Sequence, residues 1–369
     1  MSMISVLIPV YKESNLLETL LNQLLKDDYK DKEIITVIDE PTKTSINLAK
    51  KYKKKVKFIL NKVRKGKVTA LNEATKIAKG DIFLFFDSDV IISKKSRNFL
   101  KTVAEKIENV DILDIKKKPF GSSLLSKIIN YEFVVYNTYS FYCSKIVKKC
   151  IGVCGQAFAI QRIFFERIGG FQRVIAEDIE LGIQTFLKNG TFKFTDDIEV
   201  LTIQTSSWKS WFKQRERWGV GGGYQFKKHW KTILKHTFLC PRISLLTIFL
   251  GWPTLLSLLS LFLVDTFMGK LFFLSLISLS LNFTFLTPFV FILSLYTIFI
   301  RNLLLFFVTY IFSALLFYLV SKKFDHTFNK LDFTIYYILY SPVSSCFYFF
   351  HFLRGIFSSE EVILEDWKV

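Results

Sequence analysis

Residues 81–90 read DIFLFFDSDV, and this stretch decides the fold. Its apolar run, residues 82–86, is short and continuous, as in a strand that is buried on both faces of a sheet. Asp87 and Asp89 follow where this strand should end. In open α/β sheets, ligands bind at the carboxyl ends of the strands. The two aspartates therefore lie where a site is expected.

Two carboxylates this close repel each other unless a positive group lies between them. A divalent cation that is also bound by a diphosphate fits the pair, because Mg²⁺ and Mn²⁺ prefer hard oxygen ligands and keep substrate phosphates as partners. The sequence contains neither the GxGxxG turn of dinucleotide-binding folds nor a P-loop. The pattern thus favours a metal–diphosphate site of another type.

Outward from this stretch, short apolar runs alternate with segments of helical periodicity. We expect an α/β fold, with a parallel sheet and helices on both faces. The predicted strands are residues 3–10, 33–38, 56–60 and 81–86, and the predicted helices are residues 15–25, 44–53 and 68–78.

The charge is distributed unevenly along the chain. The 369 residues carry a formal net charge of +18, and all of it lies before residue 243, because basic and acidic residues balance beyond that point. Half of the residues are hydrophobic, which excludes a disordered chain. Five cysteines are too few for a disulfide scaffold, and the odd number also argues against one. The lysine-rich stretch 50–67 has few aromatics, so anionic lipid headgroups are favoured over nucleic acid.

The second part of the chain has long uncharged stretches. A membrane span needs about 20 apolar residues. We expect about four transmembrane helices, in residues 243–264, 271–300, 302–320 and 333–353. Lysines crowd the approach to the first span, which predicts that the N-terminal domain is cytoplasmic. Residues 1–11 lack the apolar length of a secretory signal, which agrees with a catalytic domain on the cytoplasmic side of the plasma membrane.

Residues 206–242 interleave tryptophans with basic residues. Trp208, Trp211 and Trp218 would not all be exposed on a solvated helix, so we expect an amphipathic helix at the membrane surface. The predicted organisation is a catalytic domain in residues 1–205, an interfacial region in 206–242, a transmembrane region in 243–354 and a cytoplasmic tail in 355–369.

Six motifs in order resemble the family 2 glycosyltransferases, a membrane GT-A class that includes cellulose, chitin and hyaluronan synthases and ceramide glucosyltransferase. The resemblance covers roughly residues 4–224. Its motifs are ISVLIPVYKE (4–13), VIDE (37–40), GKVTALNEA with AKGDIFLFFDSDV (66–90), CGQAFAIQR with IGGF (154–171), AEDIELG (176–182) and QRERW (214–218).

The resemblance implies a Rossmann-like GT-A domain and a role for each matching residue. Asp178 is implied as the general base, with Glu177 as its rival, and Asp89 and Asp87 as the ligands of Mg²⁺ or Mn²⁺. The implied nucleotide-sugar contacts are Pro9, Tyr11, Glu13, Asp39, Lys67, Asp87, Gln214, Arg217 and Trp218. The implied acceptor contacts are Cys154, Gly155, Gln156, Glu177 and Trp218.

The implied reaction is inverting transfer of a hexose from a UDP-sugar, with a β-linked product. A carboxylate can remove the proton of the acceptor hydroxyl, and the metal and Arg217 can stabilise the diphosphate. Four positions depart from the family pattern: Lys12 for Asn, Glu40 for Asp, Pro41-Thr42 for Gly-Ser, and Ala176 for Thr. They affect the expected details of donor binding more than the reaction type.

Three interpretations of the function remain. In the first, one or a few sugars are added to a membrane lipid or short glycan. In the second, a β-polysaccharide is polymerised and translocated. The first is favoured because polymerising relatives usually have membrane spans before the catalytic domain, and we expect none before this one. The third interpretation, a membrane scaffold with an inactive transferase domain, conflicts with the intact Asp87, Asp89, Asp178 and Arg217.

Overall fold

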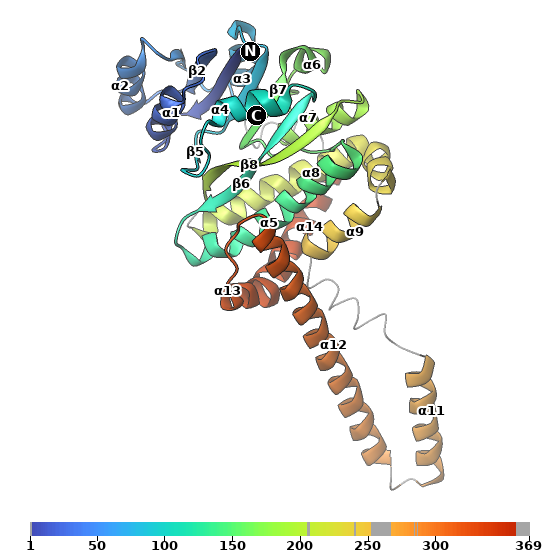
Figure 1. Ribbon diagram of the computed structural model, residues 1–369. Coiled ribbons are helices and arrows are strands. Elements are labelled where there is room, and N and C mark those ends of the chain that lie inside the picture. Colours follow the sequence, from blue (N-terminus) through green and yellow to red (C-terminus); the bar gives the residue numbers. More distant parts are fainter. Residues whose placement is uncertain are drawn as a thin grey trace. The chain divides into compact units, whose positions relative to one another are not determined.

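The computed structural model describes residues 2–204, 207–239, 241–251, 267–283, 285 and 287–358 (Figure 1). It has two compact units. The first comprises Met1–Ser244 and Cys346–Val369, and the second Leu245–Ser345.

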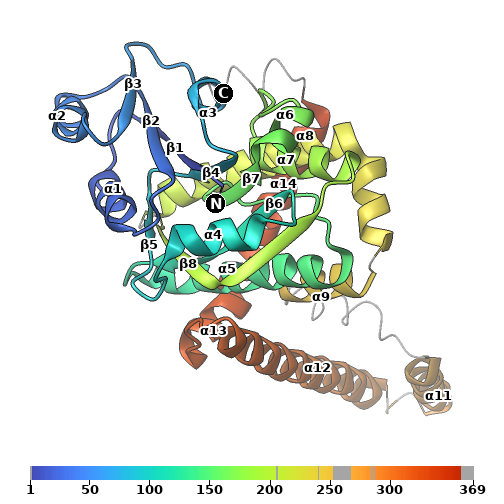
Figure 2. The same ribbon diagram turned by 45° about the horizontal axis from the view of Figure 1, so that its top comes forward.

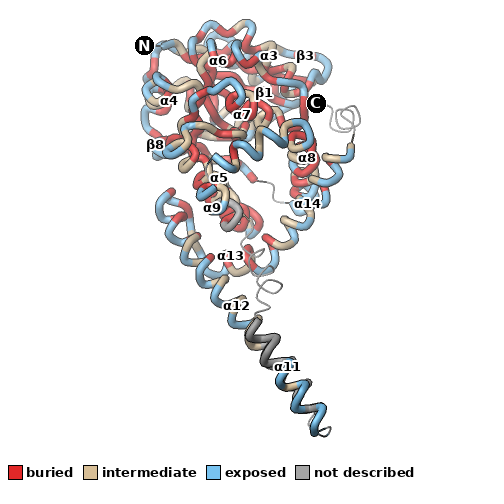
Figure 3. The backbone as a smooth tube through the Cα atoms, turned by 90° about the vertical axis from the view of Figure 1, so that its right-hand side faces the viewer, coloured by how far each residue is buried: buried red, intermediate tan, exposed pale blue. Residues whose placement is uncertain are grey.

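The first unit is built on an eight-stranded sheet with the order β3-β2-β1-β4-β7-β6-β8-β5. Except for the edge strand β3, its strands are buried along most of their length (Figure 3). The strands are β1 (Ile4–Tyr11), β2 (Lys32–Asp39), β3 (Lys57–Asn61), β4 (Ile82–Phe86), β5 (Val90–Ile92), β6 (Ile112–Phe120), β7 (Ala157–Gln161) and β8 (Phe192–Ile203).

The first four strands in the sheet order are parallel, as the alternating pattern predicts. Helices α1 (Leu17–Lys26), α2 (Lys43–Tyr52) and α3 (Lys67–Ile77) connect them, and each begins and ends within two residues of its predicted bounds. Leucines on one face of α1 pack with α4 (Phe99–Ile107) over β1. Helices α1 and α3 lie on opposite sides of β1 and β2 (Figure 2), so both faces of the sheet are covered.

Beyond β4, past the strands for which the sequence predicted a parallel arrangement, the sheet is mixed. Strand β7 pairs with β4 in the antiparallel direction, and Phe86 lies opposite Ala157. Strand β6 is antiparallel to β7 but parallel to β8. This reversal brings the start of β7 beside the end of β4, and the Asp87 N–H donates to the Gln156 carbonyl at 3.0 Å.

The remaining helices of the first unit surround this mixed half of the sheet. They are α5 (Leu124–Tyr142), the π-helix η1 (Cys143–Val147), α6 (Arg162–Arg167), α7 (Glu177–Leu187), α8 (Trp208–Leu239) and the C-terminal part of α14 (Ser341–Phe357). Helix α8 is kinked at His229, whose φ and ψ are not helical.

Helices α8 and α14 pack through glycine. A Cβ atom on Gly223 would lie 2.0 Å from the carbonyl oxygen of Phe352, and one on Gly355 would lie 2.2 Å from that of Val220. Glycine allows the two backbones to touch. The glycine run in residues 219–223, which has no place in a phosphate-binding turn, is therefore a packing surface between helices.

The tryptophan prediction is wrong for one of its three residues. Trp208 and Trp218 are exposed, but Trp211 is fully buried. Its ring packs against Phe212 and Phe347, with ring centroids 4.9 and 6.2 Å away. The surface expected to face a membrane therefore has two of these tryptophans.

The second unit is helical. It contains α11 (Phe267–Asn282), α12 (Thr287–Lys323), α13 (Lys330–Ile335) and the π-helix η3 (Tyr336–Tyr340), while α9 (Pro241–Gly251) and α14 extend across its boundaries. Tyr310 bonds the Thr334 hydroxyl at 2.7 Å. Aromatic rings, including those of Phe317, Phe333 and Tyr336, also join α12 to the segment that follows it.

One helical stretch among the described residues, Ile300–Lys323, is long and apolar enough to cross a membrane. The predicted span 271–300 is not one helix, because α11 ends at Asn282 and α12 begins at Thr287, one residue before Pro288. Proline is favoured in the first turn of a helix and disrupts its interior. Most of the predicted span 243–264 lies outside the described residues, so a bundle of about four helices stays a prediction.

The contact between α8 and α14 can be tested with Gly223→Ala. The added methyl would overlap the Phe352 carbonyl, so we expect a loss of about 2 kcal/mol in the free energy of unfolding, which is typical of overpacking. The measurement is the thermal unfolding of detergent-purified protein. Gly152→Ala is the matched control, since a Cβ there has nothing within 4 Å. Equal unfolding temperatures for the two variants would contradict the proposed packing.

Candidate active site

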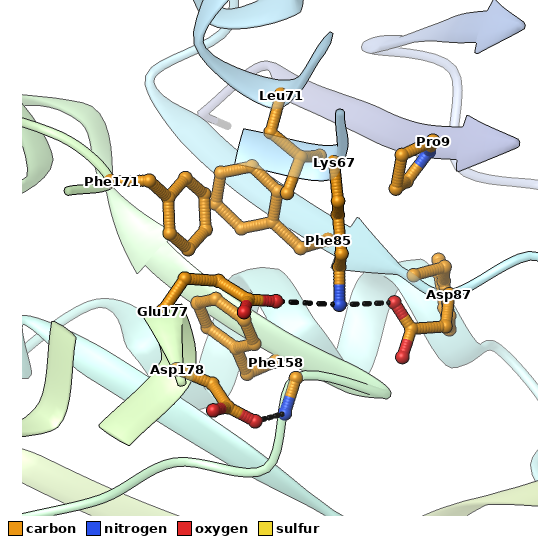
Figure 4. A pocket seen from close by; sticks show the side chains of 11 residues that line it. Pro9, Lys67, Leu71, Phe85, Asp87, Phe158, Phe171, Glu177 and Asp178 are labelled. Carbon is orange, nitrogen blue, oxygen red and sulfur yellow. Dashed lines mark hydrogen bonds and ion pairs between the residues drawn. The ribbon is translucent and has the colours of Figure 1, made fainter. Parts of the chain in front are cut away.

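A small cavity lies where β1 and β4 end and α7 begins (Figure 4). It has a volume of about 10 Å³, which is roughly the space of one water. Its lining residues are Pro9, Lys67, Leu71, Phe85, Phe86, Asp87, Gly155, Phe158, Phe171, Glu177 and Asp178. Residues from distant parts of the sequence thus meet at one point, as predicted for the strand ends.

Lys67 holds the acidic groups of this cavity together. Its Nζ lies 2.7 Å from Asp87 Oδ1 and 2.9 Å from Glu177 Oε1. Burial by itself would lower the pKa of Lys67, but the charges of Asp87, Glu177 and Asp178 outweigh it and raise the pKa well above its usual value. The ammonium group therefore stays charged and offsets the repulsion between the carboxylates.

Asp178 lies in the first turn of α7. Its Oδ2 accepts a hydrogen bond from the Gly155 N–H at 3.0 Å, and its Oδ1 accepts one from the Ile179 N–H at 2.9 Å. Burial, followed by the charge of Glu177, raises the pKa of Asp178 to about 6, although Lys67 and the two N–H groups act in the opposite direction. A carboxylate with a raised pKa is a stronger base. Glu177 is less suited to act as the base because its carboxylate is paired with the Lys67 ammonium group.

Asp89 lies two residues after Asp87, and part of its surface is exposed while protein atoms surround its carboxyl group. Desolvation by the surrounding protein and the charge of Asp87 raise its pKa to about 6, against the positive charges of Lys67 and Arg217. A cation beside the two carboxylates would relieve this repulsion, so the donor set fits Mg²⁺ or Mn²⁺. The described residues contain no group of three or more side chains that could hold a metal ion. A diphosphate could supply further oxygens.

Asp39 is buried at the end of β2 and accepts three hydrogen bonds. The donors are the Asn61 side-chain amide and the backbone N–H groups of Lys65 and Gly66, each 2.9 Å away. The carboxylate thereby shapes the turn before α3, where Gly66 has a φ of 89°. Asp39 thus helps to place Lys67, a link that the sequence motifs did not reveal.

Tyr11, at the end of β1, has a half-exposed ring. The Arg64 guanidinium lies 4.5 Å and the Lys12 ammonium 5.3 Å from the ring centroid, while the Tyr11 hydroxyl donates to Glu40 Oε2 at 3.1 Å. Lys12 and Glu40 both have a positive φ, which is rare for such residues. Sequence reasoning missed Arg64 as a contact of this ring, and its place in a basic stretch was the available signal.

Pro9 lines the cavity, whereas Glu13 lies outside it and interacts with Thr42. Glu13 Oε2 accepts a hydrogen bond from the Thr42 hydroxyl at 2.6 Å. Glu13 also borders a separate hollow of about 430 Å³ between the beginnings of α1 and α2. Pro9 and Glu13, grouped together by the motif, therefore face two neighbouring spaces.

The QRERW motif lies on α8. Arg217 is exposed, and its charge acts on Asp89. Trp218 is 41% exposed, and the guanidinium of Arg215 lies 4.2 Å from its ring centroid. Arg215 is itself buried and forms an ion pair with Glu132 of α5. No hydrogen-bond partner of the buried Gln214 Oε1 is found within the described ranges. Arg215, a variable position of QxxRW, was missed by sequence reasoning.

Cys154, Gly155 and Gln156 form the segment before β7. Burial raises the pKa of the Cys154 thiol to about 12, so the thiol stays protonated and is a poor nucleophile. A Cβ on Gly155 would lie 3.1 Å from Asp178 Oδ2 and 3.3 Å from Lys67 Nζ. This segment is therefore in direct contact with the acidic cluster, next to Asp178.

Residues 5–168 match the family described as Glycosyl transferase family 2. This part of the chain is a family 2 glycosyltransferase domain. The family predicted from the motifs is thereby confirmed.

Two relatives and one solved structure illustrate the similarity. The chain is 27% identical over 232 residues to Probable glycosyltransferase YdaM of Bacillus subtilis, which covers 60% of this chain and 55% of that protein. It is 25% identical over 250 residues to Poly-beta-1,6-N-acetyl-D-glucosamine synthase of Staphylococcus epidermidis, covering 62% and 57%. The chain thus matches just over half the length of each relative.

The solved structure is mannosyltransferase PcManGT from Pyrobaculum calidifontis in complex with GDP-Man and Mn²⁺. It matches with a TM-score of 0.53 and 17% identity, covering 82% of this chain and 87% of that chain. This likeness shows the fold, and the GT-A-like α/β architecture predicted from the sequence is confirmed.

The raised pKa of Asp178 predicts that the first unit is destabilised by its own acidic cluster. The pKa is about 6 in the folded protein and about 3.9 in an unfolded chain. The folded state therefore binds the proton more tightly, and the free energy of unfolding falls as the pH rises from about 4 to about 6. We expect Asp178→Asn to be more stable than wild type by about 1–3 kcal/mol at pH 7.5 and by only about a third of that difference at pH 4.5.

The measurement is thermal unfolding at both pH values, with Asp28→Asn at an exposed site as the control. An Asp178→Asn protein that unfolds at or below the wild-type temperature at pH 7.5 would refute this expectation.

Proposed function

We propose that the protein is an inverting hexosyltransferase. It moves a sugar from a UDP-sugar, of the UDP-glucose or UDP-N-acetylglucosamine type, to a membrane lipid or short glycan and forms a β-linkage. The observation that carries the proposal is the placement of Asp178, held by the Gly155 N–H, beside the Lys67–Asp87 ion pair. A base and a charged site for a phosphate donor thereby share one cavity.

In this proposal Asp178 acts as the general base. Its carboxylate takes the proton of the acceptor hydroxyl as that oxygen attacks the anomeric carbon, and the bond from this carbon to the diphosphate breaks. A single displacement inverts the anomeric centre, so an α-linked donor yields a β-linked product. Glu177 stays paired with Lys67 and holds the ammonium group close to the base.

The donor side is assigned to the strand ends. Pro9, Tyr11, Glu13 and Asp39 would bind the nucleoside, while Lys67, Gln214 and Arg217 would face the diphosphate. The cavity of about 10 Å³ is far smaller than ligand pockets, which have about 300–1,000 Å³. We propose that the side chains around Lys67 move when the donor binds.

Asp89, with Asp87 beside it, would hold Mg²⁺ or Mn²⁺. When bound, the ion supplies Lewis-acid stabilisation of the charge on the diphosphate leaving group. The support in this chain is the partly exposed position of Asp89 and its raised pKa. The Pyrobaculum mannosyltransferase, which shares the fold, is described with Mn²⁺.

The acceptor side is assigned to Cys154, Gly155, Gln156, Glu177 and Trp218. Arg215 stacks on Trp218 at 4.2 Å and so occupies one face of the indole. We infer that the acceptor sugar or lipid headgroup would pack on the other face, since aromatic faces are apolar contact surfaces.

We further propose that the protein is integral to the plasma membrane, with its catalytic domain in the cytoplasm. The domain boundaries predicted above, at residues 205, 242 and 354, are retained in this proposal. The support is the apolar stretch Ile300–Lys323 together with the exposed aromatic residues of α8, Trp208, Trp230 and Phe238 among them. The lysines 227, 228, 231 and 235 on the same helix suit anionic headgroups.

A second candidate function is processive synthesis of a β-polysaccharide. The observation that favours it is the similarity to a relative described as Poly-beta-1,6-N-acetyl-D-glucosamine synthase. In that case the helices of the second unit would take part in translocation. A catalytically inactive scaffold is the third candidate, and the ion-paired acidic cluster argues against it.

The test uses full-length protein in nanodiscs with Mn²⁺ or Mg²⁺, a panel of radiolabelled UDP-sugars and a membrane lipid extract. Label in the organic phase, lost in Asp178→Asn but retained in the control Asp28→Asn, is the expected result and names the sugar. Label in a high-mass, glycosidase-sensitive polymer would identify the polysaccharide synthase. Binding of UDP without turnover of any donor would favour the scaffold.

The pH dependence of kcat/KM follows from the same site. Asp178 must be ionised to accept a proton, and Asp89 must be ionised to bind a cation. Both have a pKa of about 6, so we expect kcat/KM to rise with pH up to a midpoint near 6 and then to level off. The measurement is initial rate against pH from 4.5 to 8. A profile that is flat from pH 5 to 7 would contradict the assignment.

A further inference from the structure

A buried ion pair lies in β6. Asp114 and Lys117 are both fully buried, and the Lys117 ammonium group donates to Asp114 Oδ1 and, at 2.9 Å, to the Ile115 carbonyl. Burying two charges carries a large desolvation cost, so such a pair is weak evidence for stability alone. Its partners outside the strand therefore deserve an explanation.

One partner is Tyr136 of α5. Its hydroxyl donates to Asp114 Oδ2 at 2.7 Å, and the Lys117 ammonium lies 5.2 Å from its ring centroid. Burial and the charge of Asp114 raise the pKa of Tyr136 well above its usual value, so the phenol stays neutral. Because the Tyr136 hydroxyl donates its proton to Asp114, the hydroxyl oxygen can accept a hydrogen bond from another donor. It accepts a hydrogen bond from the Cys154 N–H at 2.8 Å.

The two residues after Cys154 contact two acidic residues of the cavity, Asp178 in the first turn of α7 and Asp87 after β4. The Gly155 N–H donates to Asp178 Oδ2 at 3.0 Å, and the Gln156 carbonyl accepts from the Asp87 N–H at 3.0 Å. Gly155 has no side chain to anchor it, so backbone hydrogen bonds determine how its N–H is aimed. The Cys154 and Gly155 N–H groups lie on consecutive peptide planes, and only the φ and ψ of Cys154 separate them, so a displacement of Cys154 also displaces the Gly155 N–H.

We propose that Tyr136 is a positioning residue for sugar transfer: oriented by Asp114 and Lys117, its hydroxyl fixes the Cys154 N–H and so holds the Gly155 N–H against the Asp178 carboxylate. This inference rests on the proposed function, in which Asp178 is the base. It predicts a large effect on the chemical step and a small one on nucleotide binding, since Tyr11 and Asp39 lie on other strands with partners of their own and Asp87 is also held by Lys67.

The test compares Tyr136→Phe with wild type and with Tyr139→Phe. Tyr139 lies on the same helix but is placed near Cys143 and Cys150 instead, so it is a matched control. We expect Tyr136→Phe to lower kcat about ten- to hundredfold, the order of loss caused by a misplaced catalytic group. The Kd for UDP, measured by calorimetry with Mn²⁺, should stay within about twofold. Tyr139→Phe should leave kcat unchanged.

Hydrogen exchange supplies a readout that does not depend on turnover. We expect the amides of residues 152–158 to exchange faster in Tyr136→Phe, with the rest of the sheet unchanged. If Tyr136→Phe does not fold, the double variant Asp114→Leu/Lys117→Met replaces it, since apolar pairs often substitute for buried ion pairs. That variant keeps the phenol but removes its acceptor, and the same loss of kcat at constant UDP affinity is expected.

Unchanged kcat and unchanged exchange in residues 152–158 would overturn the inference while leaving the proposed function intact. A parallel loss of UDP binding and kcat would also overturn it, because Tyr136 would then be merely structural. If the Asp178→Asn variant turned over at the wild-type rate, that result would instead overturn the proposed function. In that case faster exchange of residues 152–158 in Tyr136→Phe would still establish that the Tyr136 hydroxyl holds the backbone at Cys154.

Discussion

The ion pairs of Lys67 are the interaction on which the site depends. Asp87 follows β4 and Glu177 begins α7, so the chain brings together carboxylates from distant parts of the sequence. Without a cation between them these groups would repel one another. The ammonium group lies within 2.9 Å of both, and its own position depends on Asp39, which shapes the turn before α3. The end of β2 and the acidic cluster are thereby coupled through one side chain.

A second constraint is the reversal of strand direction between β4 and β7. A parallel sheet alone would gather the ends of β1, β2 and β4, but it would leave the segment 154–156 elsewhere. Antiparallel pairing places Ala157 beside Phe86, so the backbone before β7 meets the backbone after β4. That contact lets one short segment touch Asp87 and Asp178 together. Asp178 and the residues that follow β4 are therefore fixed relative to each other by main-chain geometry.

Much of the first unit was predictable because its signals are local. The apolar runs and helical periods located the strands and helices up to Phe86 to within two residues. Acidic residues after those strands indicated the site. The mixed order of the later strands was not predictable, since antiparallel and parallel neighbours use the same apolar runs. The burial of Trp211 and the pairing of Arg215 with Glu132 were missed because both depend on packing between α5, α8 and α14.

The sequence by itself determined the fold class, the family and the set of chemical groups, because these follow from residue types and their local spacing. It also determined that the net charge lies before residue 243 and that the later part is apolar. Only the tertiary structure decided which carboxylate is paired and which has a raised pKa. Glu177 and Asp178 are neighbours in sequence, yet Glu177 forms an ion pair with Lys67 and Asp178 accepts a hydrogen bond from a backbone N–H. Distances and burial set those differences, and both arise from contacts between segments far apart in the chain.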